Sequence, residues 1–262
     1  MIHKISLIIS LMAIICISSC GGDDETKEPV FHVFLLLGQS NMVGYPEPAA
    51  EDMTEDSRVL VLGYDNCNAT GRVKNEWDEA APPLHVCNGG GLGPGDYFGK
   101  TLINDLPEGD TIGMVPCAIN GQAIEAFFKG TGRYEIILER ARIAQESGGV
   151  ISGILFHQGE SNSGQTLWPG NVAQFVADLK ADLQLDDTVP FLAGEMAYSG
   201  DCAPHNEQVA KLPDLIPNAY VISAEGLEVD ETDTAWGLHF GRDAQVEFGK
   251  RYAATMKTAM GL

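Results

Sequence analysis

The stretch Phe34-Leu-Leu-Leu-Gly-Gln-Ser-Asn-Met42 decides the fold class that we predict for this chain. The run 31–37 is apolar without the alternation of a half-exposed strand, which indicates a strand buried on both faces of a sheet. It stops abruptly at Gly38, and the polar Ser40 follows. In doubly wound α/β folds ligands bind at the carboxyl ends of the strands, so a serine at this point stands where a nucleophile would stand. Serine in this setting is also a common cap for a helix, here one beginning near Asn41.

Strands and helices are predicted to alternate along the rest of the chain. We predict strands at 31–37, 59–63, 111–116, 150–156, 190–195 and 219–223. We predict helices at about 96–104, 133–145 and 171–185, and a last helix that ends near 260. This alternation indicates a parallel sheet with helices on both faces, a three-layer α/β/α sandwich. With 262 residues, 44% of them hydrophobic and 20% charged, the chain is long enough for one domain with a large core.

The first 19 residues are predicted to be a signal peptide. A short basic start is followed by the apolar run 5–17, which is too short for a convincing membrane span, and by the small residues before Cys20. The ending Ile-Ser-Ser-Cys resembles a bacterial lipobox, which implies a lipid on Cys20 and an outer-membrane lipoprotein that faces the periplasm or the cell surface. Residues 20–30 would then form a flexible acidic tether. The alternative is an ordinary secreted protein with an incidental cysteine.

The formal charge of −21 and the pI near 4.4 disfavour nucleic acid and anionic membrane surfaces as partners, because both would repel this chain. Contact with a membrane is therefore expected only through the lipid on Cys20. In an oxidising compartment, Cys67 and Cys87 bracket a loop-like region that a disulfide could close, although the pairing is not determined by the sequence. The other cysteines of the body, Cys117 and Cys202, show no spacing typical of a zinc site.

The segment 65–94 is long, irregular and rich in Asn, Gly and Pro. Such segments in compact domains are usually functional or tied by a disulfide, so we expect this one to line a substrate cleft. Its glycine-rich end, 88–95, precedes a predicted helix and could offer a backbone N–H to an anion. A phosphate-binding loop would need a following Lys-Ser/Thr, which is absent. A plain flexible turn fits equally well.

Two further segments carry side chains suited to proton transfer or hydrogen bonding. The strand 150–156 ends in His-Gln-Gly-Glu-Ser-Asn at 157–162, and His239 lies just before the last predicted helix. A histidine flanked by Leu238 and Phe240 is more often structural than catalytic, so its role depends on its neighbours.

Five blocks of sequence, taken together and in order, resemble the SGNH/GDSL hydrolase superfamily. They are GQSNM at 38–42, GLGPG at 91–95, AINGQAIEAF at 118–127, HQGESN at 157–162 and GLHF at 237–240. The chain is most similar to the sialate O-acetylesterase-like proteins and the family 6 carbohydrate esterases, and the resemblance covers residues 31–260. GQSNM together with HQGESN is specific, whereas the glycine blocks alone would mean little.

The resemblance implies a role for each matching residue. Ser40 would be the nucleophile and His239 the general base. The oxyanion would be held by the N–H groups of Ser40 and Gly93 and by the side chain of Gln158. Four neighbours of these residues are candidates for oxyanion or substrate contacts: Gln39, Asn41, His157 and Trp236. The reaction would pass through an acetyl-serine intermediate and would need no metal and no organic cofactor.

The chain departs from this family at one position. Relatives place an aspartate three residues before the histidine, and Trp236 occupies that position here. Glu160 and Asp233 are the two acids that could take its place. We favour Glu160, because its motif is intact whereas Asp233 is out of register, although Glu160 could also be a structural carboxylate beneath the site.

The sequence therefore predicts a carbohydrate O-acetylesterase that acts on acetylated xylan, other polysaccharides or O-acetylated sialic acid. The alternative is a glycan-binding lipoprotein on the same fold that has lost efficient turnover together with its aspartate. Action on long acyl chains fits less well, because the polar segment before Pro94 indicates a wet cleft. The sugar, the acetyl position and the oligomeric state are left open.

Overall fold

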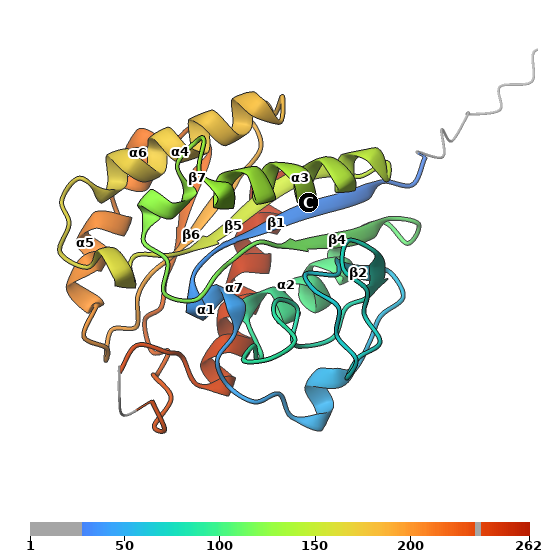
Figure 1. The fold of residues 1–262 in the computed structure, drawn as a ribbon, viewed down its shortest axis with the longest axis horizontal. Helices are drawn as coiled ribbons and strands as arrows, with labels where there is room; N and C mark the ends of the chain where they lie inside the picture. Colours follow the sequence, from blue (N-terminus) through green and yellow to red (C-terminus); the bar gives the residue numbers. More distant parts are fainter. Residues whose placement is uncertain (1–27, 234–236) are drawn as a thin grey trace, which may run out of the picture.

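The computed structural model describes residues 28–233 and 237–262, and Figure 1 shows its arrangement. A single sheet has the strand order β3-β2-β4-β1-β5-β6-β7. The strands are β1 (Phe31–Gly38), β2 (Val59–Leu62), β3 (Trp77–Glu79), β4 (Thr111–Pro116), β5 (Val150–His157), β6 (Phe191–Gly194) and β7 (Ala219–Ile222). All neighbouring strands are parallel except β3, which runs antiparallel to β2. The predicted parallel sheet is thus confirmed, and β3, which was not predicted, adds one antiparallel strand at its edge.

Helices cover both faces of the sheet. They are α1 (Ser40–Val43), α2 (Pro94–Leu102), α3 (Gly132–Glu146), α4 (Trp168–Asp182), α5 (Asn206–Val209), α6 (Leu212–Leu215) and α7 (Arg242–Met260). Short 3₁₀ turns lie at Ala50–Met53, Ile103–Asp105, Ile124–Phe127, Glu160–Asn162 and Ala203–His205. In Figure 1, α3 and α4 lie on one face, and α2 and α7 pack side by side on the other. The predicted three-layer α/β/α sandwich is confirmed.

Strand β1 is the centre of the core, which explains why its sequence is apolar without alternation. Val33, Leu35 and Leu37 point into the cluster under α3 and α4. Phe34 and Leu36 point into the cluster on the α2 and α7 side. All five side chains are fully buried. A strand whose two faces are both covered by helices has no position for a polar side chain at its centre.

The strand order fixes where a site can form. Strand β1 lies between β4 and β5. From β1 the chain first builds the sheet on the β4 side and later on the β5 side, so the winding reverses at β1. Ligands of open α/β sheets bind at such a reversal, outside the carboxyl ends of the strands. The segments after β1, β4 and β5 therefore meet in one crevice.

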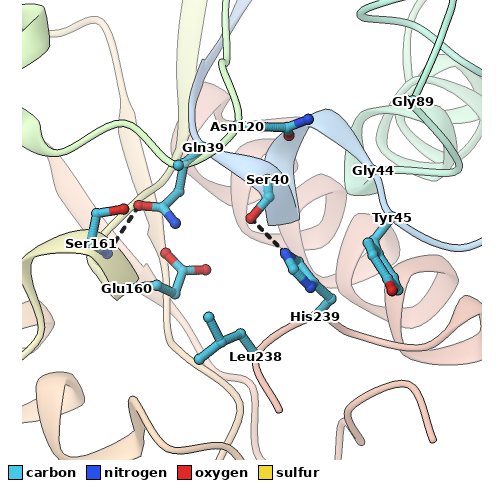
Figure 2. Close-up of a pocket in the computed structure, with 11 residues that line it drawn as sticks. Gln39, Ser40, Gly44, Tyr45, Gly89, Asn120, Glu160, Ser161, Leu238 and His239 are labelled. Atoms are coloured by element: carbon cyan, nitrogen blue, oxygen red, sulfur yellow. Dashed lines mark hydrogen bonds between the residues drawn. The ribbon is translucent and has the colours of Figure 1, made fainter. Parts of the chain in front are cut away.

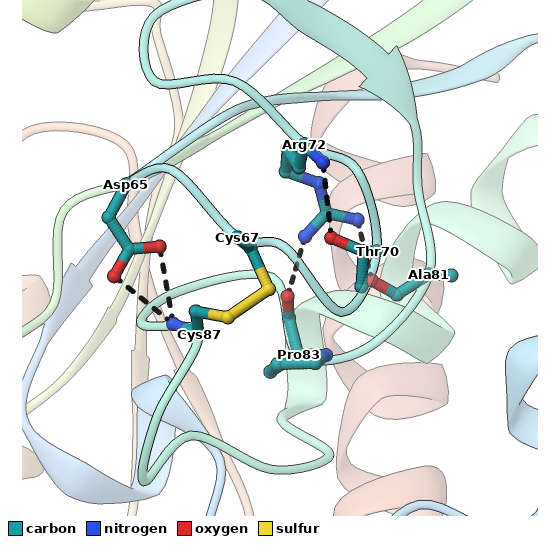
Figure 3. The surroundings of a disulfide bond; sticks show 7 residues. All are labelled: Asp65, Cys67, Thr70, Arg72, Ala81, Pro83 and Cys87. Carbon is teal, nitrogen blue, oxygen red and sulfur yellow. Dashed lines mark hydrogen bonds between the residues drawn. A yellow bond between two sulfur atoms is a disulfide. The ribbon is translucent and has the colours of Figure 1, made fainter.

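The segment 65–94 is less irregular than its composition indicates. It contains β3, whose Trp77 packs edge-on against Phe31 with ring centroids 5.0 Å apart. A disulfide joins Cys67 to Cys87, and the carboxylate of Asp65 accepts a hydrogen bond from the Cys87 N–H beside it (Figure 3). The disulfide that we considered for this region is thus confirmed, and the segment is tied down.

A buried arginine, Arg72, joins two parts of the same segment by hydrogen bonds. The Arg72 guanidinium donates to the backbone oxygens of Pro83 at 2.6 Å and Ala81 at 2.9 Å (Figure 3). Because these oxygens belong to a different part of the loop, Arg72 holds the loop together on the side away from Asp65. The remaining body cysteines, Cys117 and Cys202, are buried free thiols.

The predictions for the leader fall on residues that the structure does not describe. The predicted signal peptide, Cys20 and the tether as far as residue 27 all lie outside the described ranges. Within those ranges, no helix has the length and apolar character needed to cross a membrane.

The disulfide allows a test of how much its loop contributes to stability. The bond closes a loop with a sequence separation of 20. In the chain-entropy model a loop of this size contributes about 3 kcal/mol to the free energy of unfolding. We expect the double variant Cys67→Ser, Cys87→Ser to lose about this amount in urea denaturation followed by circular dichroism. Wild-type protein treated with reductant should behave like the double variant. An unchanged urea midpoint in both samples would contradict the expectation.

Candidate active site

A close approach between β1 and β5 sets the position of the candidate nucleophile. Gly38 has φ +131°, and a Cβ built on it would lie 1.9 Å from the backbone oxygen of His157. Only glycine fits there. The next residue, Gln39, donates its N–H to that same oxygen at 2.9 Å. The strand ends at this bond, and Ser40 becomes the first residue of α1.

Ser40, His239 and Asp233 form a continuous chain of hydrogen bonds. The Ser40 Oγ lies 2.9 Å from His239 Nε2 (Figure 2). The other ring nitrogen, His239 Nδ1, lies 2.9 Å from Asp233 Oδ2. The imidazole is largely buried and the Asp233 carboxylate almost completely so. The three side chains therefore have the geometry of a nucleophile, a base and an orienting acid.

Asp233 contacts His239 although it lies six residues earlier in the sequence. The Asp230 N–H donates to the His239 oxygen at 2.7 Å, and the Gly237 N–H donates to the Asp233 oxygen at 2.9 Å. The backbone N–H groups of Leu238 and His239 also donate to Asp233 Oδ2. Burial alone would raise the pKa of Asp233, but these two N–H groups and the facing imidazole hold it below its ordinary value.

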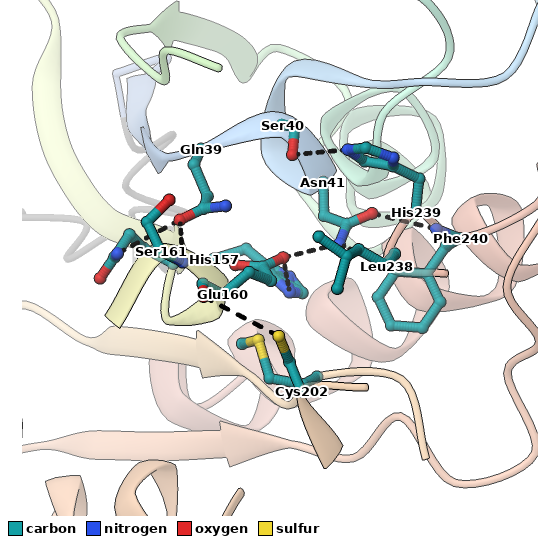
Figure 4. Close-up of polar contacts among 12 residues, drawn as sticks. Gln39, Ser40, Asn41, His157, Glu160, Ser161, Cys202, Leu238, His239 and Phe240 are labelled. Atoms are coloured by element: carbon teal, nitrogen blue, oxygen red, sulfur yellow. Dashed lines mark hydrogen bonds and ion pairs between the residues drawn. The ribbon is translucent and has the colours of Figure 1, made fainter. Parts of the chain in front are cut away.

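The preference for Glu160 as the acid beside His239 is corrected by this geometry. Glu160 Oε1 accepts a hydrogen bond of 2.7 Å from Asn41 Nδ2 and lies 3.6 Å from His157 Nε2. Its carboxylate is buried in the wall of the site, at the end of β5 (Figure 4). Burial raises the pKa of Glu160, against the lowering effect of the Asn41 hydrogen bond and of nearby backbone N–H groups.

Asn41 was expected to contact substrate or oxyanion, but it connects three segments beneath the site instead. Besides the bond to Glu160, its Nδ2 donates to the Leu238 oxygen at 3.0 Å. Its Oδ1 accepts from the Phe240 N–H at 3.0 Å (Figure 4). These two bonds hold the backbone on both sides of His239. Asn41 is 1% exposed, so its contribution to the site is structural.

The expectation that Gln158 donates to an oxyanion is also corrected. Its Nε2 donates to Asn162 Oδ1 at 2.7 Å and lies 3.2 Å from both Gln39 Oε1 and the Gln122 oxygen. Its Oε1 accepts from Trp168 Nε1 at 2.6 Å. The amide is buried and both of its N–H groups are engaged, so it has no donor free for a substrate.

Gly93 is unsuited to the same role. Its N–H donates to Asp96 Oδ2 at 3.0 Å, where it caps the start of α2. Burial raises the pKa of this carboxyl to about 7, with the Gly93 N–H acting in the opposite direction. The donor that we assigned to Gly93 is therefore used inside the protein.

The three side chains open into a cleft with a volume of about 650 Å³. The segments after β1, β4 and β5 and the segment before α7 all contribute to it, as the strand order requires (Figure 2). Its lining consists of Gln39, Ser40, Gly44, Tyr45, Gly89, Asn120, Gly121, Glu160, Ser161, Leu238 and His239. Gly89 belongs to the segment 65–94, which was predicted to line a cleft. Among the residues predicted to contact the oxyanion or substrate, Gln39 lines this cleft.

Asn120 is a residue of this cleft that the sequence analysis missed. In Figure 2 it lies on the other side of Ser40 from His239. No side-chain hydrogen bond of Asn120 is found among the described residues, so its amide is available to a ligand. A signal was present, because Asn120 follows β4, the strand next to β1, at its carboxyl end.

The two remaining candidates are His157 and Trp236. His157 is completely buried between the rings of Phe240 and Phe248, and burial lowers its pKa to about 3, so it is a neutral packing residue. Trp236 lies outside the described residues. In the ranges that are described, no group of three or more His, Cys, Asp or Glu side chains is arranged to hold a metal ion.

Comparison with known proteins identifies the family of this chain. The family model described as carbohydrate esterase, sialic acid-specific acetylesterase, matches residues 30–258. A probable carbohydrate esterase of Arabidopsis thaliana is 28% identical over an alignment of 251 positions, which covers 86% of this chain and 90% of that protein. The crystal structure of that Arabidopsis protein superposes with a TM-score of 0.74 and 27% identity, over 88% of this chain and 99% of its own.

Two more distant structures share the fold alone. The crystal structure of NanS has a TM-score of 0.68 at 18% identity, over 88% of this chain and 98% of NanS. A carbohydrate acetylesterase from Xanthomonas citri has a TM-score of 0.64 at 20% identity, over 87% of this chain and 56% of that one. The family match covers the whole sheet together with Ser40, His239 and Asp233. The chain therefore belongs to the carbohydrate esterase family of sialic acid-specific acetylesterases and is a carbohydrate O-acetylesterase.

Proposed function

We propose that this carbohydrate O-acetylesterase is a serine esterase that removes O-acetyl groups from neutral sugars through an acetyl intermediate on Ser40. The observation that carries the proposal is the chain of hydrogen bonds from Ser40 through His239 to Asp233, with 2.9 Å at each link. A serine hydroxyl becomes an effective nucleophile when an adjacent base takes its proton and a third group orients that base.

The proposed reaction has two steps. In the first, Ser40 Oγ attacks the acetyl carbonyl while His239 Nε2 takes the hydroxyl proton. The tetrahedral intermediate then collapses, the bond to the sugar oxygen breaks, and His239 returns the proton to that oxygen. In the second step a water molecule gives a proton to His239 and attacks acetyl-Ser40. The bond between the acetyl carbon and Ser40 Oγ then breaks, His239 returns the proton to Ser40 Oγ, and acetate leaves.

We propose two donors for the oxyanion of both tetrahedral intermediates. The Ser40 N–H is the first of helix α1, so it has no acceptor within the helix. The Asn120 amide lines the same cleft across Ser40 from His239. Each donor of this kind typically contributes about 3 kcal/mol to lowering the barrier.

The charge of the cleft favours a neutral sugar, such as acetylated xylan, over O-acetylated sialic acid. None of the described residues that line the cleft is lysine or arginine, and residues 234–236 are Thr-Ala-Trp by sequence. A sialic acid carboxylate would thus meet no lysine or arginine among these residues, but it would lie near Glu160. The charge of −21 adds a repulsive field for any anionic substrate.

The alternative of a glycan-binding protein without turnover rested on the absence of an acid at position 236. Asp233 now provides a carboxylate at hydrogen-bond distance from His239, so that reason no longer applies.

The roles of the two acids can be separated by isosteric substitution. We expect Asp233→Asn to lower kcat by about a thousandfold to ten-thousandfold, because an amide cannot stabilise the charged imidazole. Glu160→Gln should lower kcat less than about tenfold, because its Oε1 can still accept the hydrogen bond from Asn41. The measurement is hydrolysis of 4-nitrophenyl acetate by the chain from residue 25 onward, with Ser40→Ala as the inactive reference. A larger loss in Glu160→Gln than in Asp233→Asn would reverse the assignment.

The substrate preference can be tested by adding a positive charge to the cleft. Ser161 is an exposed residue of the cleft lining, and its backbone N–H donates to Gln39 Oε1; no hydrogen bond of its side chain is found among the described residues. We expect wild-type kcat/KM to be higher for acetylated xylo-oligosaccharides than for O-acetylated sialic acid. Ser161→Arg should raise kcat/KM for the sialic acid about threefold to tenfold, as expected for one exposed ion pair, and leave the neutral substrate unchanged.

The matched control for this test is Ser161→Gln, which adds length without charge and should change neither substrate. The proposed preference is contradicted if wild-type enzyme prefers the sialic acid substrate, or if the glutamine variant reproduces the effect of arginine.

We also propose that the mature protein is an outer-membrane lipoprotein, on the basis of the lipobox-like ending before Cys20. Expressed with its leader in a bacterium, the wild-type chain should fractionate with membranes, and Cys20→Ser should release it, because its anchor is a lipid. Cys16→Ser, four residues earlier in the same leader, is the matched control and should stay with the membranes. Retention of Cys20→Ser in the membrane fraction would refute the anchor.

A further inference from the structure

The ring of Tyr45 lies flat against the imidazole of His239. The two rings are nearly parallel, with an angle of 8° between their planes and 4.2 Å between their centroids. Tyr45 is 42% exposed, so core packing alone does not explain why this side chain is held in one place. No proton-transfer step of the proposed reaction uses it.

The imidazole needs such a neighbour, because its two hydrogen bonds leave one motion free. Ser40 is bound at Nε2 and Asp233 at Nδ1, on two different atoms of the ring. Rotation of the ring about the line joining these two atoms lengthens neither bond appreciably. It changes the direction of the Nδ1–H bond and of the Nε2 lone pair, however, and hydrogen bonds weaken as they bend. A ring stacked on one face of the imidazole opposes this rotation directly.

The backbone of Tyr45 is fixed by the disulfide-tied segment. Gly44, with φ +98°, accepts a hydrogen bond of 3.0 Å from the Gly91 N–H. On the other side of Tyr45, the Pro46 oxygen accepts one of 2.8 Å from the Leu92 N–H. A Cβ on Gly91 would lie 2.3 Å from the Pro46 oxygen, so the two backbones are in close contact. Tyr45 is therefore placed by this contact rather than by its own side chain.

We propose that Tyr45 is a positioning residue for His239, which restrains the imidazole and stabilises its charged form during acyl transfer. The inference rests on the proposed function, because it assigns to His239 the role of general base. An aromatic face attracts a cation, and His239 is cationic only while it holds the serine proton, so the contact is stronger in the transition state than in the resting enzyme. In Figure 2, Tyr45 lies on one side of the imidazole, and Glu160 and Ser161 lie on the other.

Three variants separate the ring from its bulk and from its hydroxyl. Tyr45→Phe keeps the aromatic face and should retain wild-type kcat. Tyr45→Leu keeps apolar bulk but has no aromatic face, and we expect it to lower kcat for 4-nitrophenyl acetate and acetylated xylo-oligosaccharides about threefold to tenfold. Its KM should change less than about twofold, because the residue acts on His239 and not on the sugar. Tyr198→Leu replaces another exposed tyrosine, 53% exposed and outside the cleft, and should leave both constants unchanged.

The outcomes distinguish this inference from the proposed function. If wild-type activity is no greater than that of Ser40→Ala, the proposed function fails, and the positioning role of Tyr45, which rests on it, fails with it. If wild-type enzyme is active and Tyr45→Leu keeps its kcat, the positioning role is refuted. A rise in KM at constant kcat would also refute it, since that result indicates contact with substrate. An equal loss in Tyr45→Phe and Tyr45→Leu would show that the hydroxyl matters instead of the ring.

Discussion

The hydrogen bond from the Gln39 N–H to the His157 oxygen is the contact on which the site depends. It forms only because Gly38 has no Cβ, since any side chain there would overlap that oxygen. The bond joins the ends of β1 and β5 at the point where the winding of the sheet reverses. It places Ser40 on the cleft, and Glu160, three residues after the end of β5, in the wall of the same cleft. The position of Ser40 is thus determined by backbone contacts and does not depend on the other side chains of the site.

A second layer of contacts connects the nucleophile to a segment that is distant in sequence. Asn41, adjacent to Ser40, accepts from the Phe240 N–H and donates to the Leu238 oxygen, so it holds the backbone on both sides of His239. Glu160 holds the amide of Asn41 in turn. Because all these groups are buried, each unmade bond would leave a polar atom without a partner. The distance from Ser40 to His239 is therefore specified by the core as well as by their own hydrogen bond.

Much of this structure could be predicted from the sequence, and the failures have a common physical cause. Continuous apolar runs located six of the strands, and the ends predicted for β4 were those observed. What failed were statements about which donors are free. Gln158 and Gly93 were chosen for the oxyanion, yet their N–H groups are used by partners inside the protein. Asn120 was missed because the sequence does not show whether its side-chain amide has a hydrogen-bond partner inside the protein. Sequence motifs locate side chains along the chain, but they do not record which hydrogen bonds are already made.

The choice between the two acids shows the same principle at the level of charge. Glu160 and Asp233 are both buried, and burial raises the pKa of a carboxyl group. For Glu160 the raising effect dominates. Asp233 accepts from two backbone N–H groups and faces the imidazole, and together these contacts lower its pKa below the ordinary value. An acid that orients a general base must stay ionised while the base gains a proton. Asp233 meets that requirement because the backbone N–H groups of Leu238 and His239 donate to its carboxylate. The sequence did not indicate this, because Asp233 lies six residues before His239 instead of the three expected for the family.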